Sequence, residues 1–288
     1  MSARIGLNVR QRKLASELRR LRELALLTSE QVAQRLGWSA SKISRIENAR
    51  IKLRPEDVQQ LLDLYEVPVD QREELLELAG EPDRKRWWDA YSDTLSAEML
   101  SLISLEDTAV AARNFEPMLI PGLLQTEAYA REVFGMWKVL SRLPPIQLER
   151  RLEARVTRQL ILLKERPLTL HVIVDEAVLS RQIGNASVMR DQLRHLAETS
   201  RAPNITVQVL PLAQEREVMA IEPFVLLEIP DFRPVLCVEN LFDSRLHIDD
   251  ADHVHMYSLM FDGVRDAARP PEESRILIER TAKDLWGA

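Results

Sequence analysis

Cysteine is almost absent from this 288-residue sequence, which contains only Cys237. An intrachain disulfide is therefore excluded, and so are zinc sites built from several closely spaced cysteines. No run of eighteen apolar residues is present, so we expect no membrane-spanning helix and no membrane partner. The N-terminus is polar and basic and lacks the apolar segment of a signal peptide, which favours a cytoplasmic location.

Several motifs of enzymes are missing as well. The sequence has no glycine-rich phosphate loop and no GxSxG elbow around a nucleophilic serine. The run from His247 to His255 has residue types that bind metals, but His253 and His255 are two residues apart and would point to different faces of a helix. An acidic helix start, stabilised by the helix dipole, explains the aspartates of this run. We therefore expect no catalytic residue, no metal site and no cofactor.

Positive charge is scarce in most of the chain and concentrated at its start. Residues 1–54 contain thirteen Lys or Arg and four Glu, a balance of +9, whereas the remaining residues carry −15, for a total of −6. A chain with this overall charge is not a nucleic-acid binder as a whole. Its basic first segment, however, has the charge that binding to DNA phosphates requires.

Within this basic segment, the sequence TSEQVAQRLGWSASKISRIEN has the pattern of two short helices joined by a turn. Thr28 has the spacing of a capping box at the start of the first helix, and Gly37 ends that helix. Ser39 can cap a second helix whose inward residues are Ile43 and Ile46. An ordinary helical hairpin would share these features. The coincidence of the pattern with local positive charge favours a helix-turn-helix, which places its second helix in the major groove of DNA.

The outward side chains of the second helix are the candidate base contacts. Arg45 is long enough to reach a guanine edge, and Ser41 and Ser44 offer short, adaptable hydrogen bonds. Neighbouring basic residues and the first helix start are candidate phosphate contacts. The predicted DNA-binding residues are Ser29, Ser39, Ala40, Ser41, Lys42, Ser44, Arg45, Arg50, Lys52 and Arg54. Weaker candidates, because a basic helix face is often only solvated, are Arg10, Arg12, Lys13, Arg19, Arg20 and Arg22.

The segment from Leu14 to Leu64 resembles helix-turn-helix domains of the xenobiotic-response-element type, a five-helix fold shared with phage repressors. The resemblance rests on SASKISRIEN, residues 39–48. It implies a first helix from about Arg10 to Ala25, a fourth from Pro55 to Tyr65 and a fifth from Gln71 to Ala79.

Glycine is missing at two positions where this type of domain usually has it, after the first helix and after the reading helix. Leu26 and Ala49 occupy these positions. A left-handed cap at either residue would cost about 1 kcal/mol. Asn48 could take the left-handed conformation instead, which would shift the caps by one residue.

The change in charge near residue 54 and the segment after Gly80 indicate two domains. We predict a DNA-binding domain over residues 1–80, a linker over 81–86 and an α+β domain over 87–288. Helices are expected over 94–114, 126–137, 146–164, 176–182, 187–200, 248–267 and 272–286, and strands over 168–175, 205–210, 224–229 and 235–239. The chain is therefore predicted to be mainly α, with a five-helix repressor-like bundle followed by helices packed on one face of a small, mostly antiparallel sheet.

The second domain resembles a domain of unknown function that follows this type of DNA-binding domain in many regulators of filamentous soil bacteria, some of them described as antitoxin-like. The resemblance is carried by IPGLLQT at residues 120–126 and NITVQVLP at 204–211, among other segments. It implies regulation, often with a small partner protein encoded by a neighbouring gene, and no known catalytic reaction.

We therefore predict a sequence-specific DNA-binding transcriptional regulator that binds a double-stranded operator as a homodimer. Its second domain is expected to receive a small-protein or small-molecule signal. One alternative is an antitoxin-like protein that neutralises a partner protein and autoregulates its operon. Another is an enzyme fused to a DNA-binding domain.

Two segments of the second domain are candidates for the site that receives the signal. The apolar turn at residues 118–124 either packs into the core or covers a pocket or partner. The basic helix at 146–164 could line a pocket for an anionic ligand, or could be a solvated face paired with Glu149 and Glu153. Its arginines are Arg150, Arg151, Arg155 and Arg158. The predicted effector or partner contacts are Trp88, Tyr91, Pro121, Gly122, Gln125 and Arg155.

Overall fold

The computed structural model describes residues 9–49, 51, 53–80, 86–141, 144–212, 222–230, 233–239, 244–247 and 251–287. The chain divides into two compact units, Met1–Ala90 and Tyr91–Ala288. Of the predicted linker at residues 81–86, only Arg86 belongs to the described residues. None of the helices in the described ranges combines the length and the apolar character needed to cross a membrane.

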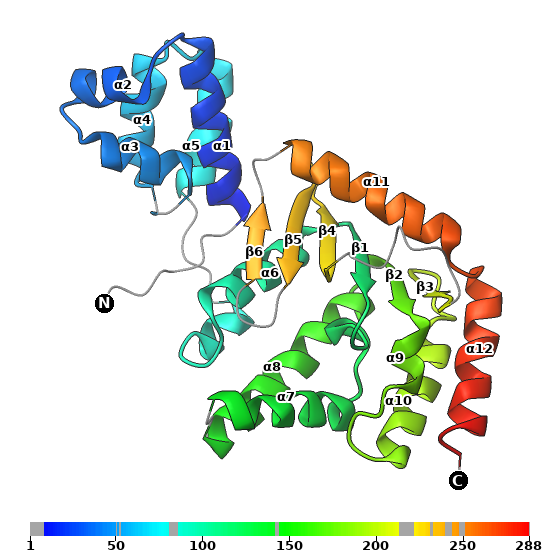
Figure 1. Cartoon of the computed structure of the whole chain (residues 1–288). Helices are drawn as coiled ribbons and strands as arrows, with labels where there is room; N and C mark the ends of the chain where they lie inside the picture. The colour runs from blue at the N-terminus through cyan, green and yellow to red at the C-terminus, as the bar shows by residue number, and fades with distance from the viewer. Residues whose placement is uncertain are drawn as a thin grey trace. The chain divides into compact units, whose positions relative to one another are not determined.

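The first unit is a bundle of five helices (Figure 1). They are α1 (Val9–Leu24), α2 (Ser29–Leu36), α3 (Ala40–Glu47), α4 (Pro55–Leu64) and α5 (Val69–Gly80). The helices enclose one apolar core, and Ile43 and Ile46 of α3 lie in it with 1% of their surface exposed. The predicted five-helix bundle and the inward orientation of these two isoleucines are therefore confirmed. A short 3₁₀ helix, η1 (Trp87–Tyr91), follows along the chain.

Side-chain hydrogen bonds between near neighbours set the ends of α2 and α3. Thr28 Oγ1 accepts a hydrogen bond from the Gln31 amide at 3.2 Å, and Gln31 Oε1 accepts one from the Thr28 amide at 2.8 Å. These reciprocal bonds form the predicted capping box. Gly37 ends α2 in the left-handed conformation, with φ 66°. Ser39 Oγ accepts from the Lys42 amide at 3.1 Å and so caps α3, as expected.

The caps after α1 and α3 correct the expected shift onto Asn48. Leu26 and Ala49 themselves are left-handed, with φ of 56° and 47°, whereas Asn48 has φ −92°. The amide of Leu26 donates to the Glu23 carbonyl at 3.0 Å, and the next amide donates to the Arg22 carbonyl at 3.1 Å. This bond pair satisfies the last carbonyls of α1 and requires a left-handed residue at position 26. Backbone hydrogen bonding therefore outweighs the steric cost of the leucine side chain.

Replacing Leu26 by glycine is expected to stabilise the first unit. The side chain of Leu26 is 89% exposed and contributes little burial, so the substitution mainly relieves the left-handed backbone strain. We expect a gain of about 0.5–1 kcal/mol in the free energy of unfolding, measured by chemical denaturation. Leu24→Gly is the matched control, because Leu24 is exposed but helical and its replacement should destabilise α1. Equal destabilisation by both glycines would contradict this interpretation.

The second unit contains a six-stranded mixed sheet with strand order β3-β2-β1-β4-β5-β6. Its strands are β1 (Ala111–Glu116), β2 (Thr169–Asp175), β3 (Ile205–Leu210), β4 (Phe224–Glu228), β5 (Val235–Glu239) and β6 (Ser244–His247). β2 pairs in parallel with β1 and β3, and the other three pairings are antiparallel. The predicted combination of helices with a small, mostly antiparallel sheet is confirmed.

Two of these strands, β1 and β6, were not expected from the sequence. The predicted helix over 94–114 was too long, because α6 ends at Thr108 and β1 begins at Ala111. The sequence of β1, AARNFE, contains Ala, Arg and Asn, which favour strands weakly or not at all. The strand forms because its backbone pairs with β2 on one side and with β4 on the other.

The second unit contains helices and two short 3₁₀ segments among its described residues. In chain order the elements are α6 (Ala97–Thr108), η2 (Gly122–Leu124), α7 (Glu127–Ser141), α8 (Pro145–Gln159), η3 (Leu160–Leu163), α9 (Glu176–Ser180), α10 (Ala186–Thr199), α11 (Ala251–Ala267) and α12 (Pro271–Asp284). The predicted helix over 146–164 therefore ends earlier than expected and continues as η3.

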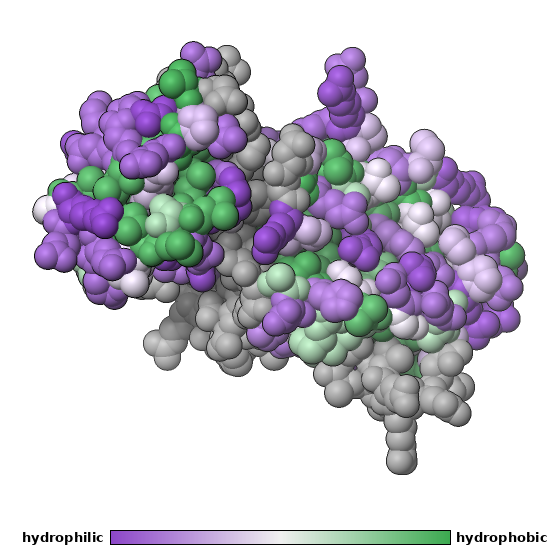
Figure 2. Space-filling model, turned by 90° about the horizontal axis from the view of Figure 1, so that it is seen from above, coloured by the Kyte–Doolittle hydropathy of each residue, from purple (hydrophilic) through white to green (hydrophobic). Residues whose placement is uncertain are grey.

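Helices cover both faces of the sheet, which corrects the expectation of a single covered face. α11 packs Val254, Phe261 and Val264 against one face, and Figure 2 shows a mainly hydrophilic surface over this helix. On the other face, residues of α6 and α8 surround Ala112 and Leu170, whose side chains alternate with those under α11. The physical reason is that the central parallel strand β2 carries buried apolar residues on both sides, Leu170, Val172 and Val174 on one and Ile173 on the other.

A half-buried histidine, His171, makes the stability of the second unit dependent on pH. Burial lowers the pKa of His171 in β2, and its Nε2 lies 2.7 Å from Gln208 Oε1. The unfolded chain, in which the pKa is near 6.5, therefore binds more protons than the folded chain below that pH. The stabilising contribution of neutral His171 is complete above about pH 6.5 and is lost as the pH falls toward the lowered folded-state pKa.

We expect the denaturant concentration at the unfolding midpoint of the full chain to decrease as the pH is lowered from 7 to 5.5. The substitution His171→Gln should make this decrease smaller. Chemical denaturation at several pH values measures both effects. His195, whose pKa burial also lowers, contributes to the pH dependence that remains in this variant. An unchanged pH slope in the His171→Gln variant would contradict the assignment to His171.

Candidate DNA interface

The outer face of α3 is formed by short polar residues and one arginine. Ala40, Ser41, Ser44 and Arg45 are exposed, as is the capping residue Ser39. This exposure follows from the helical period, because Ile43 and Ile46 turn the opposite face into the core. The arrangement presents small hydrogen-bonding groups on a helix whose other face is anchored by packing.

Arg45 is held along the outer face by one weak local contact. Its Nε donates to the Ser41 carbonyl oxygen at 3.1 Å, one helical turn earlier. The neighbouring Ser44 accepts hydrogen bonds from Asn48 Nδ2, at 2.7 Å through its carbonyl and 3.4 Å through its hydroxyl. No ion pair engages Arg45 within the described part of the chain. The guanidinium can therefore exchange its backbone contact for a base edge or a phosphate at low cost.

Lys42, which was predicted to hold a phosphate, is engaged within the first unit. Its Nζ lies 2.7 Å from Asp57 Oδ1 of α4 and 3.4 Å from the centre of the Trp38 ring. Its side chain remains 27% exposed. A phosphate would have to compete with a carboxylate for this ammonium group, which weakens the prediction of Lys42 as a phosphate contact.

The remaining predicted phosphate contacts lie before and after α3 in the sequence. Ser29 is the first residue of α2 and is half-buried, and Arg54 is exposed at the residue before α4. Both lie at helix N-termini, where unpaired amides favour anions. Arg50 and Lys52 lie outside the described residues, and so do the side chains of Arg10, Arg12 and Lys13.

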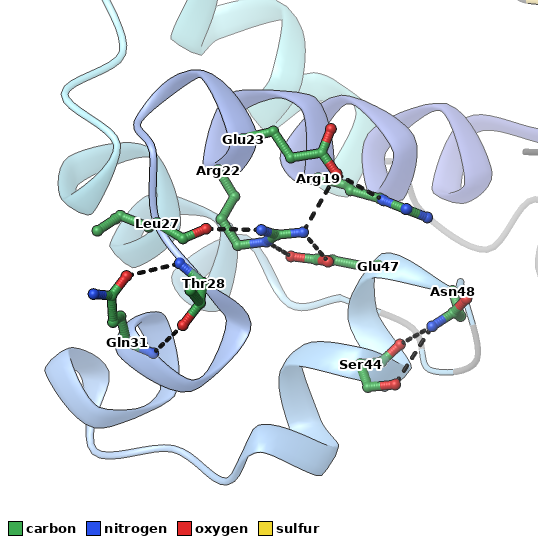
Figure 3. Close-up of polar contacts among 9 residues, drawn as sticks. All are labelled: Arg19, Arg22, Glu23, Leu27, Thr28, Gln31, Ser44, Glu47 and Asn48. Atoms are coloured by element: carbon green, nitrogen blue, oxygen red, sulfur yellow. Dashed lines mark hydrogen bonds and ion pairs between the residues drawn. The ribbon is translucent and has the colours of Figure 1, made fainter.

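One charged pair that supports α3 was missed by the sequence interpretation. Arg22 of α1 donates to Glu47 of α3 through Nε at 2.6 Å and Nη2 at 3.0 Å, and Arg22 Nη1 donates to the Leu27 carbonyl at 2.8 Å (Figure 3). The two side chains are only 11% and 9% exposed. Arg22 therefore links α1 to α3 inside the first unit, and this pairing weakens its case as a DNA contact. The sequence did contain a signal for this pair. Glu47 lies four residues after the buried Ile43 and therefore on the same, inward face of α3.

In the second unit, the structure brings together four of the predicted effector contacts, Pro121, Gly122, Gln125 and Arg155. Arg155 Nη1 donates to Gln125 Oε1 at 2.9 Å, and a side chain at Gly122 would meet the same guanidinium at 2.5 Å. Gly122 thus permits the close approach of Arg155. Pro121 lines the same small cavity of about 50 Å³ as Gly122 and Arg155. Trp88 and Tyr91 lie on η1 and are largely buried, and Arg150 lies over the Tyr91 ring at 5.8 Å.

The apolar turn that carries these residues packs mainly into the core. Ile120 and Leu124 are at most 1% exposed, whereas Met118 at the start of the turn is 46% exposed. Side chains of other helices satisfy its backbone: Gln192 Nε2 donates to the Leu124 carbonyl at 2.8 Å, and Gln159 Nε2 donates to the Gly122 carbonyl at 3.0 Å. The turn is thus a fixed part of the unit.

The fold and the exposed α3 define a DNA-binding regulator of the helix-turn-helix class, and residues 13–75 match the family described as "Helix-turn-helix domain". Residues 99–280 match the family described as "Domain of unknown function (DUF5753)". Because the second match spans more than half of the chain, the protein belongs to the DUF5753 family. No curated protein and no solved structure matches the chain.

Proposed function

We propose that this protein is a sequence-specific transcriptional regulator in which α3 reads the major groove of an operator. The observation that carries the proposal is the exposed face of Ser41, Ser44 and Arg45 on a helix anchored by Ile43 and Ile46. Helix-turn-helix proteins place such a face against base edges and commonly bind two half-sites as a dimer. We include a homodimer on a roughly palindromic operator in the proposal, together with a non-catalytic second unit that receives a signal.

The electrostatic part of this proposal is tested by the dependence of binding on salt. The logarithm of the association constant should fall linearly with the logarithm of salt concentration, with a slope of about −0.9 per phosphate neutralised. Arg54→Ala should reduce that slope by about 1 per chain without changing the preferred sequence. Fluorescence anisotropy with an operator found by genome-wide footprinting measures both quantities.

Arg190→Ala is the matched control, because it removes one arginine from α10 in the second unit, where its side chain is 28% exposed. It should leave the salt slope unchanged. A flat salt response of the unmodified protein would contradict DNA binding through the basic first unit, and equal slopes for the Arg54 and Arg190 variants would exclude Arg54 as a phosphate contact.

A further inference from the structure

A second pocket of the DUF5753 unit lies among α6, α7 and α8, beside the small cavity at Gly122. Its volume is about 150 Å³. Most of its wall is apolar and comes from Leu95, Met99, Ile103, Phe134 and Ala154. It is smaller than the roughly 300–1,000 Å³ of pockets that hold drug-sized ligands. An apolar cavity of about 150 Å³ is large enough for a benzene ring.

The charged residues that line this pocket are all arginines of α8. Of the described lining residues, Arg151, Arg155 and Arg158 are cationic and none is a carboxylate. Arg158 is neutralised by Glu106 of α6, with Nε and Nη2 at 2.6 and 2.5 Å from the two carboxylate oxygens. The side chain of Glu106 is 1% exposed, so this buried ion pair is a fixed part of the pocket wall.

Among the three arginines that line the pocket, Arg151 is the one for which the described residues supply no hydrogen-bond acceptor. Its Nε atom is buried and has no hydrogen-bond partner, and within the described ranges no ion pair joins Arg151 to a carboxylate. Burial alone lowers the pKa of Arg151. The neighbouring Arg150 also has a buried Nε without a hydrogen-bond partner, but its Nη2 pairs with Asp93 at 2.9 Å. Glu149 on the same helix pairs with Arg131 of α7.

A half-buried guanidinium without a hydrogen-bond acceptor destabilises the folded chain, because no hydrogen bond offsets the free energy of removing the group from water. The planar fork of arginine matches a carboxylate, which can accept two parallel hydrogen bonds from it. A ligand that combines a carboxylate with a small apolar body would satisfy both Arg151 and the wall of Leu95, Met99 and Phe134. Inorganic phosphate would supply the charge but would leave the apolar wall without a partner.

We propose that this pocket binds a small organic carboxylate whose apolar body is about the size of one ring, with Arg151 as the carboxylate contact. The proposal gives a chemical class to the signal of the second unit and so rests on the proposed regulatory function. Binding itself can be measured without DNA, which keeps the two proposals separable.

The test uses the full chain and three probes in isothermal titration. Benzoate carries the ring and the carboxylate, benzamide carries the same ring without the charge, and inorganic phosphate carries charge without the ring. We expect benzoate to bind one site per chain and the other two probes to bind at least about tenfold more weakly, because each lacks one of the two interactions.

Arg151→Met should weaken benzoate binding by about tenfold or more, since it removes the charge-assisted hydrogen bonds. The variant should remain folded, with unchanged far-UV circular dichroism and an unfolding temperature that is equal or higher, because it removes a desolvated charge. Arg150→Met is the matched control on the same helix and should change the affinity by less than about threefold. Arg151→Lys should recover part of the binding.

Three outcomes would overturn the proposal: no benzoate binding, equal binding of benzoate and benzamide, or full benzoate affinity in the Arg151→Met variant. Operator binding, measured on the same preparation, separates this failure from failure of the proposed function. A protein that retains the operator but not benzoate disproves only the pocket proposal. A protein that binds benzoate through Arg151 but no DNA disproves only the regulator proposal.

Discussion

Arg45→Ala is expected to remove the preference of the protein for its operator over unrelated DNA. A good bidentate contact from arginine to guanine contributes about 1–3 kcal/mol of discrimination, so specific affinity should fall by about ten- to a hundredfold. Binding to unrelated DNA should fall much less, because the phosphate contacts remain. Anisotropy titrations with operator and scrambled duplexes measure the ratio of the two affinities.

The fold should be unaffected by this substitution, because Arg45 is exposed and its only described hydrogen bond is to the Ser41 carbonyl of its own helix. Far-UV circular dichroism checks this point. Arg190→Ala removes the same charge from the second unit and should keep the operator preference. If the Arg45 variant discriminated as well as the unmodified protein, the proposed docking of α3 in the major groove would be wrong.

Glu47→Ala is expected to destabilise the first unit by about 3 kcal/mol, because it leaves the guanidinium of Arg22 largely buried without its partner. Operator binding should weaken with it, because Glu47 ties the reading helix α3 to α1. Hydrogen exchange, resolved by peptide, measures the stability of α1 and α3 within the full chain. Glu23→Ala is the control, because Glu23 is exposed. Its pairs with Arg19 at 3.1 Å and with Arg22 at the longer distance of 3.6 Å should together contribute less than about 1 kcal/mol.

A double replacement separates the charge pair from packing. Arg22→Met combined with Glu47→Leu removes both charges and should recover most of the stability lost in Glu47→Ala, because burying a charge pair is itself costly. Equal stability of Glu47→Ala and the unmodified protein would show that the pair does not hold α3 to α1.

The helix-turn-helix could be predicted because its signals act over a few residues. The capping box joins Thr28 to Gln31, and the cap of α3 joins Ser39 to Lys42. The exposure of Ser41, Ser44 and Arg45 likewise follows from the period of one short helix. Each of these features depends on chain neighbours, so no knowledge of the tertiary fold was needed.

Partner choice among the charged residues could not be predicted in the same way. Arg22 and Lys42 carry the positive charge that DNA contacts require. They pair instead with Glu47 and Asp57, which lie 25 and 15 residues away along the chain. The same holds in the second unit, where Arg158 reaches Glu106 across 52 residues. Local pattern shows that a residue is charged and on which helix it lies, but not which carboxylate the packed helices bring to it.

Short-range chemistry along the chain was thus sufficient to establish a basic, capped helix-turn-helix and the outward face of its reading helix. Three-dimensional packing alone decided that AARNFE becomes the strand β1, because only pairing with β2 and β4 overcomes its weak strand preference. Packing alone also decided that no carboxylate of the described residues pairs with Arg151 of α8. Long-range contacts choose partners, and those contacts exist only once distant segments have come together.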